Sequence, residues 1–528
     1  MKTNGRKLLL ATILLFMVTA IAPLQLNMAE ASKSIAINLA ANPLSFDPLF
    51  AMIDAEKILL ANCHEGLVLW DQGVLAPGMA ERWYISADAK TYTFHLKEAY
   101  WSNGDQLTAE DFELSWKRIL STELGTAPGE LLAVIKNARA YGEGKLASGE
   151  EVGVKALDKR VLQVVLEEPC SYFLNLLTFP AFMPVHAKYL QEKNLNYAPG
   201  FCSNGPFRIG EMEAGNHAIL LANEYYRGAR GNIREIRVTF LQPKTGVTLF
   251  GAGMLDLLED PPFSMFGEYT DRLVQASTMG TGFLYLNTRR PPLNNVLFRK
   301  ALSLALNRDL LVAKTLGYAG VPATGLIPPG MADSKSGSDF RQTGGDLIGP
   351  ADGKKSLDLL YQAGYPNEDG YPPLEILVVD SLVPNEMAKT IAEMWEVNLG
   401  LKTEVKAVSY NDFLALAASN RFYTARQGWT GDYPDPMTFL QLFQSQAPEN
   451  FACYQNMEYD YWLAVARKTT DSISRFKIYH QLEERLLSDL PVIPLYFSVK
   501  PYLVSPKLTG LTYTPQGYPL FQKARKMD

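Results

Sequence analysis

The chain has 528 residues, of which 47% are apolar, and a formal net charge of −6. Its length suggests about two to four domains of about 150 residues each, with enough apolar residues to fill large cores. The mildly acidic balance argues against nucleic acid or an anionic membrane as a partner.

The first 31 residues are expected to be a cleaved export signal. An almost unbroken apolar stretch covers 8–22, and Ala29-Glu30-Ala31 has the small-x-small pattern of a cleavage site. A membrane anchor is the alternative, but these fifteen apolar residues are short for a span of about twenty. Cleavage removes the negative charge of Glu30 and the positive charges of Lys2, Arg6 and Lys7. The formal net charge therefore moves from −6 to −8.

The compartment expected for the mature chain is the Gram-negative periplasm. The first cysteine is Cys63, so no cysteine near the cleavage site can carry a lipid anchor. No later segment is long and apolar enough to cross a bilayer. An exported protein without an anchor needs an outer compartment to retain it.

The pattern along the chain is mixed α and β, with no internal repeat. Residues 92–96 alternate as a half-buried strand, and 101–105 read as a turn. Thr108 is expected to cap a following helix, with Asp111 three residues on. Three amphipathic helices are marked by apolar residues at helical spacing: Phe112, Trp116, Ile119 and Leu120; Phe298, Ala301, Leu302, Ala305 and Leu306; Met387, Ile391, Met394 and Trp395. Residues 328–355 are expected to form a long surface loop.

Cysteine and histidine offer little chemistry. The four cysteines allow three pairings if all are oxidised, and the sequence alone does not choose among them: Cys63, Cys170, Cys202 and Cys453. Cys63-His64 is the only close Cys/His pair, and adjacent residues rarely face one metal ion. We therefore expect no metal site and no cofactor.

Several ordered landmarks resemble one family of exported binding proteins. Near the start these are Phe46-Asp47-Pro48, Cys63 to Leu67, Gly78 to Trp83, Tyr92 to Lys97, Trp101 to Asp105 and Thr108 to Phe112. Later ones are Asn204 to Arg208, Asn223 to Tyr226, Phe298-Arg299, Asn307-Arg308, Ala363-Gly364-Tyr365, Arg426 to Pro436 and Pro491 to Tyr496. Together they resemble the periplasmic oligopeptide-binding proteins of the bacterial extracellular solute-binding protein family 5, the peptide/nickel-binding family.

The resemblance implies a two-lobed α/β protein of the periplasmic-binding-protein type (Venus flytrap, type II), with an extra subdomain in the first lobe. By position, lobe I is expected to comprise 32–64, 189–285 and 499–528. The extra subdomain is expected at 65–188 and lobe II at 286–498. The implied protein is a monomer that closes on short peptides and delivers them to the permease and ATPase complex of an ABC importer at the inner membrane.

The segment Gly428-Trp429-Thr430-Gly431-Asp432-Tyr433-Pro434-Asp435-Pro436 is the candidate binding site. Its glycines and prolines suit an irregular site better than a regular core element. The resemblance implies that Asp432 binds the peptide ammonium and that Arg426 is the candidate for the carboxylate, through its fork geometry. Gly428, Trp429 and Thr430 offer a backbone edge along which a peptide can lie as an added strand.

Other residues complete the expected site. Residues 51–55, including Met52 and Asp54, are expected to form the opposing edge from the other lobe, and Tyr410 an aromatic wall. Asp432 is alternatively a turn residue that caps Tyr433-Pro434. Arg426 is alternatively a surface residue or an ion-pair partner of Asp432.

The sequence also departs from the family pattern. Members that bind peptides of different length take the carboxyl end with different basic groups. Around the aligned positions this chain has Pro384, Ala417 and Ala418, so either Arg426, the one obvious cation, takes this role or water mediates the contact. The preferred peptide length therefore stays open.

Other functions have less support in the sequence. On the same fold, the ligand could be a nickel chelate, a haem or a peptidoglycan-derived peptide, although histidine is sparse for a chelate site. An exported hydrolase would need a catalytic motif, and G-x-S-x-G, H-E-x-x-H and the P-loop pattern are all absent. A chaperone-like protein would not distinguish free from acetylated peptide ends. We therefore expect a binding protein and not an enzyme.

Overall fold

The computed structural model describes residues 33–71, 73–121, 127–146, 148–189, 201–262, 267–335, 337–365 and 374–528. The predicted signal, 1–31, lies outside these ranges. Among the described residues, no helix combines the length and the apolar character needed to cross a membrane.

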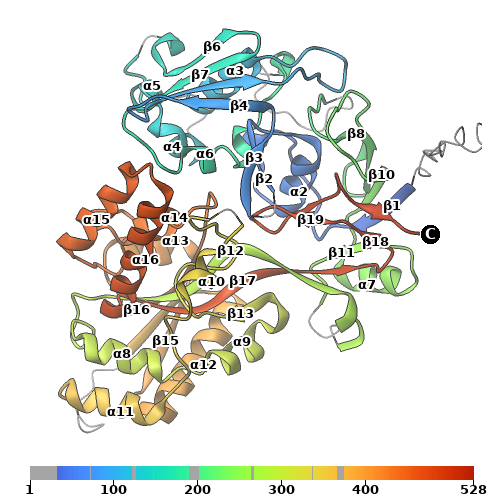
Figure 1. The fold of residues 1–528 in the computed structure, drawn as a ribbon. Coiled ribbons are helices and arrows are strands. Elements are labelled where there is room, and N and C mark those ends of the chain that lie inside the picture. The colour runs from blue at the N-terminus through green and yellow to red at the C-terminus, as the bar shows by residue number, and fades with distance from the viewer. Residues whose placement is uncertain are drawn as a thin grey trace, which may run out of the picture.

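One continuous sheet of eleven strands organises the molecule, in the order β15-β14-β16-β12-β17-β11-β1-β10-β9-β8, with β13 beside β17. We call the two halves that this sheet joins lobe I and lobe II; they lie at the right and the lower left of Figure 1. The lobe I strands are β1 (Lys33–Asn38), β8 (Phe207–Glu213), β9 (His217–Ala222), β10 (Ile233–Thr239) and β11 (Leu257–Glu259). The lobe II strands are β13 (Gly320–Pro322), β14 (Leu374–Val379), β15 (Thr403–Val408) and β16 (Thr424–Thr430).

Two long antiparallel strands, β12 (Leu273–Leu286) and β17 (Val492–Val504), run through both lobes. Their pairing shifts register between Ser277 and Gly280, where Met279 has a φ of 53°. A non-glycine residue at positive φ inside a strand marks an irregular, bulged position. The crossing between the lobes is therefore a paired ribbon with a local irregularity near its middle.

Helices cover the sheet on both lobes (Figure 1). Lobe I carries α2 (Asp54–Cys63) and α7 (Pro243–Gly251). Lobe II carries α8 (Val296–Leu304), α9 (Arg308–Thr315), α10 (Phe340–Gly344), α11 (Gly353–Gln362), α12 (Leu382–Leu399), α13 (Tyr410–Ala418), α14 (Met437–Leu440), α15 (Met457–Lys468) and α16 (Ser472–Asp489). The helices predicted from the apolar residues at 298–306 and 387–395 are confirmed as α8 and α12. The loop expected at 328–355 contains α10, and its Met331 and Phe340 are buried.

A separate four-stranded sheet, in the order β4-β5-β7-β6, forms the subdomain at the top of Figure 1. Its elements are β4 (Ala80–Ile85), β5 (Thr91–Leu96), β6 (Val154–Asp158), β7 (Val161–Val165), α3 (Ala109–Ile119), α4 (Ala127–Leu131), α5 (Ala138–Gly142) and α6 (Phe173–Leu176). Short pairs complete the fold: β2 (Val68–Asp71) with β3 (Val74–Pro77), β18 (Leu508–Thr509) with β21 (Arg525–Lys526), and β19 (Thr512–Tyr513) with β20 (Pro519–Leu520). The residue boundaries that the sequence suggested for the lobes stay predictions.

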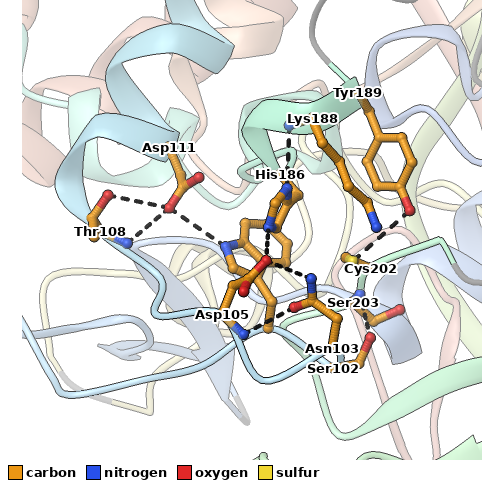
Figure 2. A network of polar contacts seen from close by, with 11 residues as sticks. Ser102, Asn103, Asp105, Thr108, Asp111, His186, Lys188, Tyr189, Cys202 and Ser203 are labelled. Atoms are coloured by element: carbon orange, nitrogen blue, oxygen red, sulfur yellow. Dashed lines mark hydrogen bonds and ion pairs between the residues drawn. The ribbon is translucent and has the colours of Figure 1, made fainter.

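The start of α3 forms as predicted. The Thr108 backbone N–H donates to Asp111 Oδ2 at 2.8 Å, which completes a capping box (Figure 2). The predicted turn closes where Trp101 N–H donates to the Asp105 carbonyl at 2.8 Å. Asp105 then contacts His186 Nε2 at 3.0 Å (Figure 2), which ties this turn to the chain that returns toward lobe I.

The sequence left the disulfide pairing of the four cysteines open, and three of them form no disulfide. Cys63, Cys170 and Cys453 are free and buried. Burial raises the pKa of the Cys63 thiol to about 12, so this thiol stays protonated and unreactive at neutral pH. Cys202 is also buried, and its sulfur accepts a hydrogen bond from Tyr189 Oη at 3.8 Å (Figure 2).

The loop that follows β1 is held by one buried carboxylate. Glu56, in the first turn of α2, accepts four backbone N–H groups through its two carboxylate oxygens. The donors are Leu44, Ser45, Met52 and Ile53, at 2.7, 3.0, 2.6 and 3.0 Å. This carboxylate fixes the position of residues 44–53 at the edge of lobe I.

We expect Glu56→Gln to lower the free energy of unfolding by about 1–3 kcal/mol, because an amide has one acceptor oxygen and would face two N–H donors with an NH2 group. Urea denaturation measures the change. The matched control is Glu404→Gln, an exposed position on β15, which should leave the midpoint unchanged. A Glu56→Gln protein as stable as the control would show that the loop is held by other contacts.

Candidate functional site

The candidate segment begins in β16, which lies between β14 and β12 in the sheet, and ends as an irregular turn. β16 runs antiparallel to β12 over its whole length, from Thr424 to Thr430. With β14 it pairs only at Thr424 and Ala425. Among the described residues, no strand pairs with the β14 side of 426–430. The backbone of Gly428, Trp429 and Thr430 therefore lies on an open strand edge.

The turn after β16 is anchored to the crossing ribbon. Gly431 N–H donates to the carbonyl of Met279, the irregular residue of β12, at 3.0 Å. A Cβ at position 431 would lie 2.9 Å from Thr438 Cγ2 and 3.1 Å from Met331 Cε, so glycine fits this close approach best. The position of Asp432 is thereby fixed relative to the point where the lobes are joined.

Asp432 is a half-buried carboxylate that makes no hydrogen bond or ion pair with any described residue. It lines a cavity of about 460 Å³, together with Trp429, Glu449 and Arg467 of lobe II and Leu131 of the subdomain. Burial raises the pKa of Asp432 to about 6, and the negative charge of Glu449 adds to this rise. The positive charge of Lys57, on α2 of lobe I, acts in the opposite direction. The charged form of such a carboxylate is stabilised when a cation enters the cavity.

The alternative role for Asp432, a cap of Tyr433-Pro434, is not supported by any hydrogen bond to a described residue, whereas the nearby Asp435 caps the next element. Asp435 Oδ1 accepts the Met437 N–H at 3.0 Å at the start of α14, and its side chain is fully buried. Asp435 Oδ2 also lies 3.8 Å from Arg475 Nη2. Asp435 therefore caps α14, and Asp432 has no such structural role.

Subdomain residues fix the same turn from the other side. The rings of Tyr172 and Tyr433 stack with centroids 4.8 Å apart and an angle of 6° between their planes. Asn175 Nδ2 donates to the Pro434 carbonyl at 2.9 Å. Arg475 Nη1 donates to the Ser171 carbonyl at 2.8 Å. The segment that carries Asp432 is thus held by contacts from both lobe II and the subdomain.

Arg426 lies on the same strand but faces the opposite side from Trp429. Its paired residue, Leu284, belongs to the core on one face of the sheet, whereas Trp429 packs on the core of the other face. Arg426 Nη2 donates to Tyr496 Oη, and its guanidinium lies 5.6 Å from the centre of that ring. Arg426 Nε has no partner among the described residues. Arg426 and Asp432 therefore do not form the ion pair that the sequence left open.

Trp429 shapes the cavity wall. Its indole N–H donates to Thr438 Oγ1 at 3.2 Å, and its ring packs against the core. A ring held in this way is a fixed surface beside Asp432. The neighbouring Thr430 is exposed.

The lobe I segment 51–55, predicted as the opposing edge of the site, is a loop followed by the start of a helix. Met52 is 78% exposed, and the N–H donors of Met52 and Ile53 are already taken by Glu56. Asp54 begins α2, where it contacts Lys500 Nζ and accepts a hydrogen bond from Tyr518 Oη at 3.0 Å. Its carboxylate is thus engaged within lobe I.

Tyr410 begins α13 and is 60% exposed, and it is not among the residues that line the Asp432 cavity. Among the described residues, no group of three His, Cys, Asp or Glu side chains is arranged to hold a metal ion. The sequence did not point to Lys57, Glu449 or Arg467. They come from distant parts of the chain, and no local pattern marks them.

With this geometry in hand, the relationship to known proteins can be stated. Residues 74–451 match the family described as bacterial extracellular solute-binding proteins, family 5 Middle. The chain belongs to this family. Its fold is the two-lobed α/β fold of periplasmic binding proteins, as the resemblance implied.

Three similar proteins illustrate the family. The dipeptide-binding protein DppE of Bacillus subtilis is 30% identical over 498 residues, which cover 92% of this chain and 90% of that protein. The unliganded open form of the murein tripeptide-binding protein MppA has a TM-score of 0.81 at 26% identity and covers 94% of this chain and 98% of its own. The Haemophilus influenzae OppA complex with RPPGFSPFR has a TM-score of 0.69 at 28% identity and covers 94% and 99%.

We expect Asp432→Asn to stabilise the unliganded protein by about 1–3 kcal/mol at pH 7.5. The folded state raises the pKa of this carboxyl from its ordinary value to about 6, so ionisation disfavours folding above that pH. As the pH falls through 6 toward 4, the wild type regains this stability by binding a proton, and the difference should vanish. Thermal unfolding at several pH values measures it. A lower melting temperature for Asp432→Asn at pH 7.5 would show that Asp432 is a structural residue.

Proposed function

We propose that this protein captures short peptides between its lobes by hinge closure and delivers them to an ABC importer in the inner membrane. The observation that carries the proposal is the unpaired carboxylate of Asp432 beside the open edge of β16. The relatives include dipeptide-, oligopeptide- and murein tripeptide-binding proteins, which supports a peptide ligand.

The peptide would lie as an added strand on the open edge of β16. Its backbone would exchange hydrogen bonds with Gly428, Trp429 and Thr430, which requires no particular side chain. Its ammonium would pair with Asp432 in the cavity beyond the strand end. A charge-assisted bond of this kind is strong where water is excluded.

Arg426 would receive the carboxylate at the other end of the peptide. A ligand on a strand edge has access to both faces of the sheet, so the orientation of Arg426 away from Trp429 is compatible with this role. The Nε atom of Arg426 is buried and has no hydrogen-bond partner among the described residues, so a bound carboxylate could supply one. Met52 would cover the ligand from lobe I and Tyr410 would border it, while Asp54 would hold the lobe I edge in place.

Closure would occur about the irregular segment of β12 and β17. With the lobes apart, the strand edge and Asp432 would be exposed, and a bound peptide would join the two lobes. The closed form is what the membrane transporter would recognise. Export to the periplasm by a cleaved signal over 1–31, action as a monomer and binding without turnover belong to the same proposal.

We expect short peptides with a free amino end to bind the wild type and Asp432→Ala to weaken them by about 2–5 kcal/mol, or about thirtyfold to several thousandfold. N-acetylated peptides should bind the wild type as weakly as free peptides bind the variant. Isothermal titration calorimetry measures both. The control is Asp358→Ala, an exposed position on α11. Equal binding of free and acetylated peptides would refute the role of Asp432.

We expect peptide affinity to be highest between about pH 6 and 7.5. Below pH 6 the unliganded Asp432 is protonated and must release its proton to bind an ammonium, so affinity should fall up to tenfold per pH unit. Above about 7.7 the peptide amino group loses its own charge. Asp432→Asn should lose the acid limb of this profile and keep only weak binding. An unchanged acid limb in this variant would assign the titration to another group.

Native mass spectrometry of the protein purified from a bacterial periplasm identifies its natural ligand. A spread of short-peptide masses would support the proposal and give the preferred length. A single haem, metal-chelate or peptidoglycan-derived mass would keep the fold and replace the substrate.

A further inference from the structure

Three strands of lobe II end at the edge that faces lobe I. β12 enters lobe II from lobe I, and β16 runs antiparallel to it, so Thr430 lies at the end nearer lobe I and Thr424 at the far end. β14 is parallel to β16 and to β15. The segments that follow β14, β15 and β16 therefore share one edge of the sheet, which borders the opening between the lobes.

The side chains that follow β14 and β15 at this edge are large, apolar and exposed. Leu382 and Val383 begin α12 and are 79% and 38% exposed, and Tyr410 begins α13. They lie close together, because Val379 pairs with Val408 and Asp380 N–H then donates to the Val408 carbonyl at 2.7 Å. We call Leu382, Val383 and Tyr410 the apolar rim.

The apolar rim adjoins the open edge of β16. β14 leaves β16 after Ala425 and passes within a few residues into α12. A strand added to β16 would take up the line that β14 vacates, so one of its ends would lie over the start of α12. If its ammonium is at Asp432, beyond Thr430, that end is the carboxyl end, near Arg426.

We propose that the apolar rim receives the side chain of the ligand's carboxyl-terminal residue and selects a large apolar one. This inference rests on the proposed peptide function and specifies the substrate class of the same site. An exposed apolar cluster beside a binding edge gains free energy when a ligand removes it from water.

The charges around the rim favour the same choice. The first turns of α12 and α13 contain no Lys, Arg or His. The carboxylates nearby are already engaged within the protein: Asp380 with Asn385 Nδ2 at 2.9 Å, Asp412 with Ser409 Oγ at 2.7 Å, and Glu386 with Lys389 Nζ at 2.9 Å. An acidic ligand side chain would meet apolar groups and negative charge, without a free cation to receive it.

Lobe I offers a matching surface. β1 is parallel to β11, which is antiparallel to β17, so β1 ends toward lobe II. The loop that follows β1 carries Met52 and Leu44, both largely exposed. Lobe closure would bring these side chains toward the apolar rim, so that a ligand side chain could be covered from both lobes.

The test is calorimetry with the full mature protein. Alanine peptides of two to five residues first fix the length that binds, and peptides of that length then carry one Leu or Glu at either end. We expect Leu at the carboxyl end to strengthen wild-type binding about tenfold or more over all-alanine, and Glu there to weaken it. Leu at the amino end should have a smaller effect.

The double variant Leu382→Asn/Val383→Asn should lose the preference for Leu at the carboxyl end while it retains affinity for the all-alanine peptide within about threefold. Val397→Asn, an exposed apolar position farther along α12, is the matched control and should keep the preference. Equal wild-type affinity for carboxyl-terminal Leu, Glu and Ala overturns the inference and leaves the peptide function standing. Failure of the wild type to bind any of these peptides overturns both.

Discussion

The pairing of β12 with β17 is the constraint on which the rest of the structure depends. These two strands belong to both lobes at once, so the sheets of the lobes are one sheet and their strand ends face each other. β12 also aligns β16, and the carbonyl of its irregular residue Met279 holds the Gly431 N–H. The same ribbon therefore positions the binding edge and carries the irregular segment about which the lobes would rotate. Binding and closure are connected through covalent backbone and a few hydrogen bonds.

The site is built at an energetic cost to the unliganded protein. Water is partly removed from Asp432, no described cation is bonded to it, and Glu449 adds repulsion. The surrounding turn is held in place by other contacts: Tyr433 is stacked on Tyr172, and the buried Asp435 accepts the Met437 N–H. A poorly solvated charge held on a rigid support is typical of functional sites, because the ligand supplies the missing partner. In the proposed function, the stability that is lost locally would be regained when an ammonium binds.

Much of the architecture could be predicted from local pattern. Thr108 and Asp111 indicate the start of α3, because their side chains suit a capping box. The spacing of apolar residues at 298–306 and 387–395 predicts α8 and α12. The Gly- and Pro-rich segment 428–436 was expected to be irregular, which holds from Gly431 onward, whereas residues 428–430 belong to the regular strand β16. These features depend on residues a few positions apart, which a sequence displays directly.

What could not be predicted depends on contacts across the chain. Asp432 and Asp435 look equally suited to cap a turn, and only the fold shows that Met437 uses Asp435. The face of the sheet on which Arg426 lies follows from its pairing with Leu284, and this pairing cannot be read from the sequence. The lobe I segment 51–55 was expected to form the opposing edge of the site. The backbone N–H groups of Met52 and Ile53 instead donate to Glu56, which lies in α2. The influence of Lys57 on Asp432 joins positions 375 residues apart.

The double use of β12 also restricts how this chain can change during evolution. Loops elsewhere can gain or lose residues with little effect on the strands they join. A single residue inserted into β12 between Gly280 and Leu286 would turn its following side chains to the opposite face of the sheet. It would shift their alignment with β16 on one side and β17 on the other at once. Homologues that diverge freely in side chains should therefore keep the length of this strand constant.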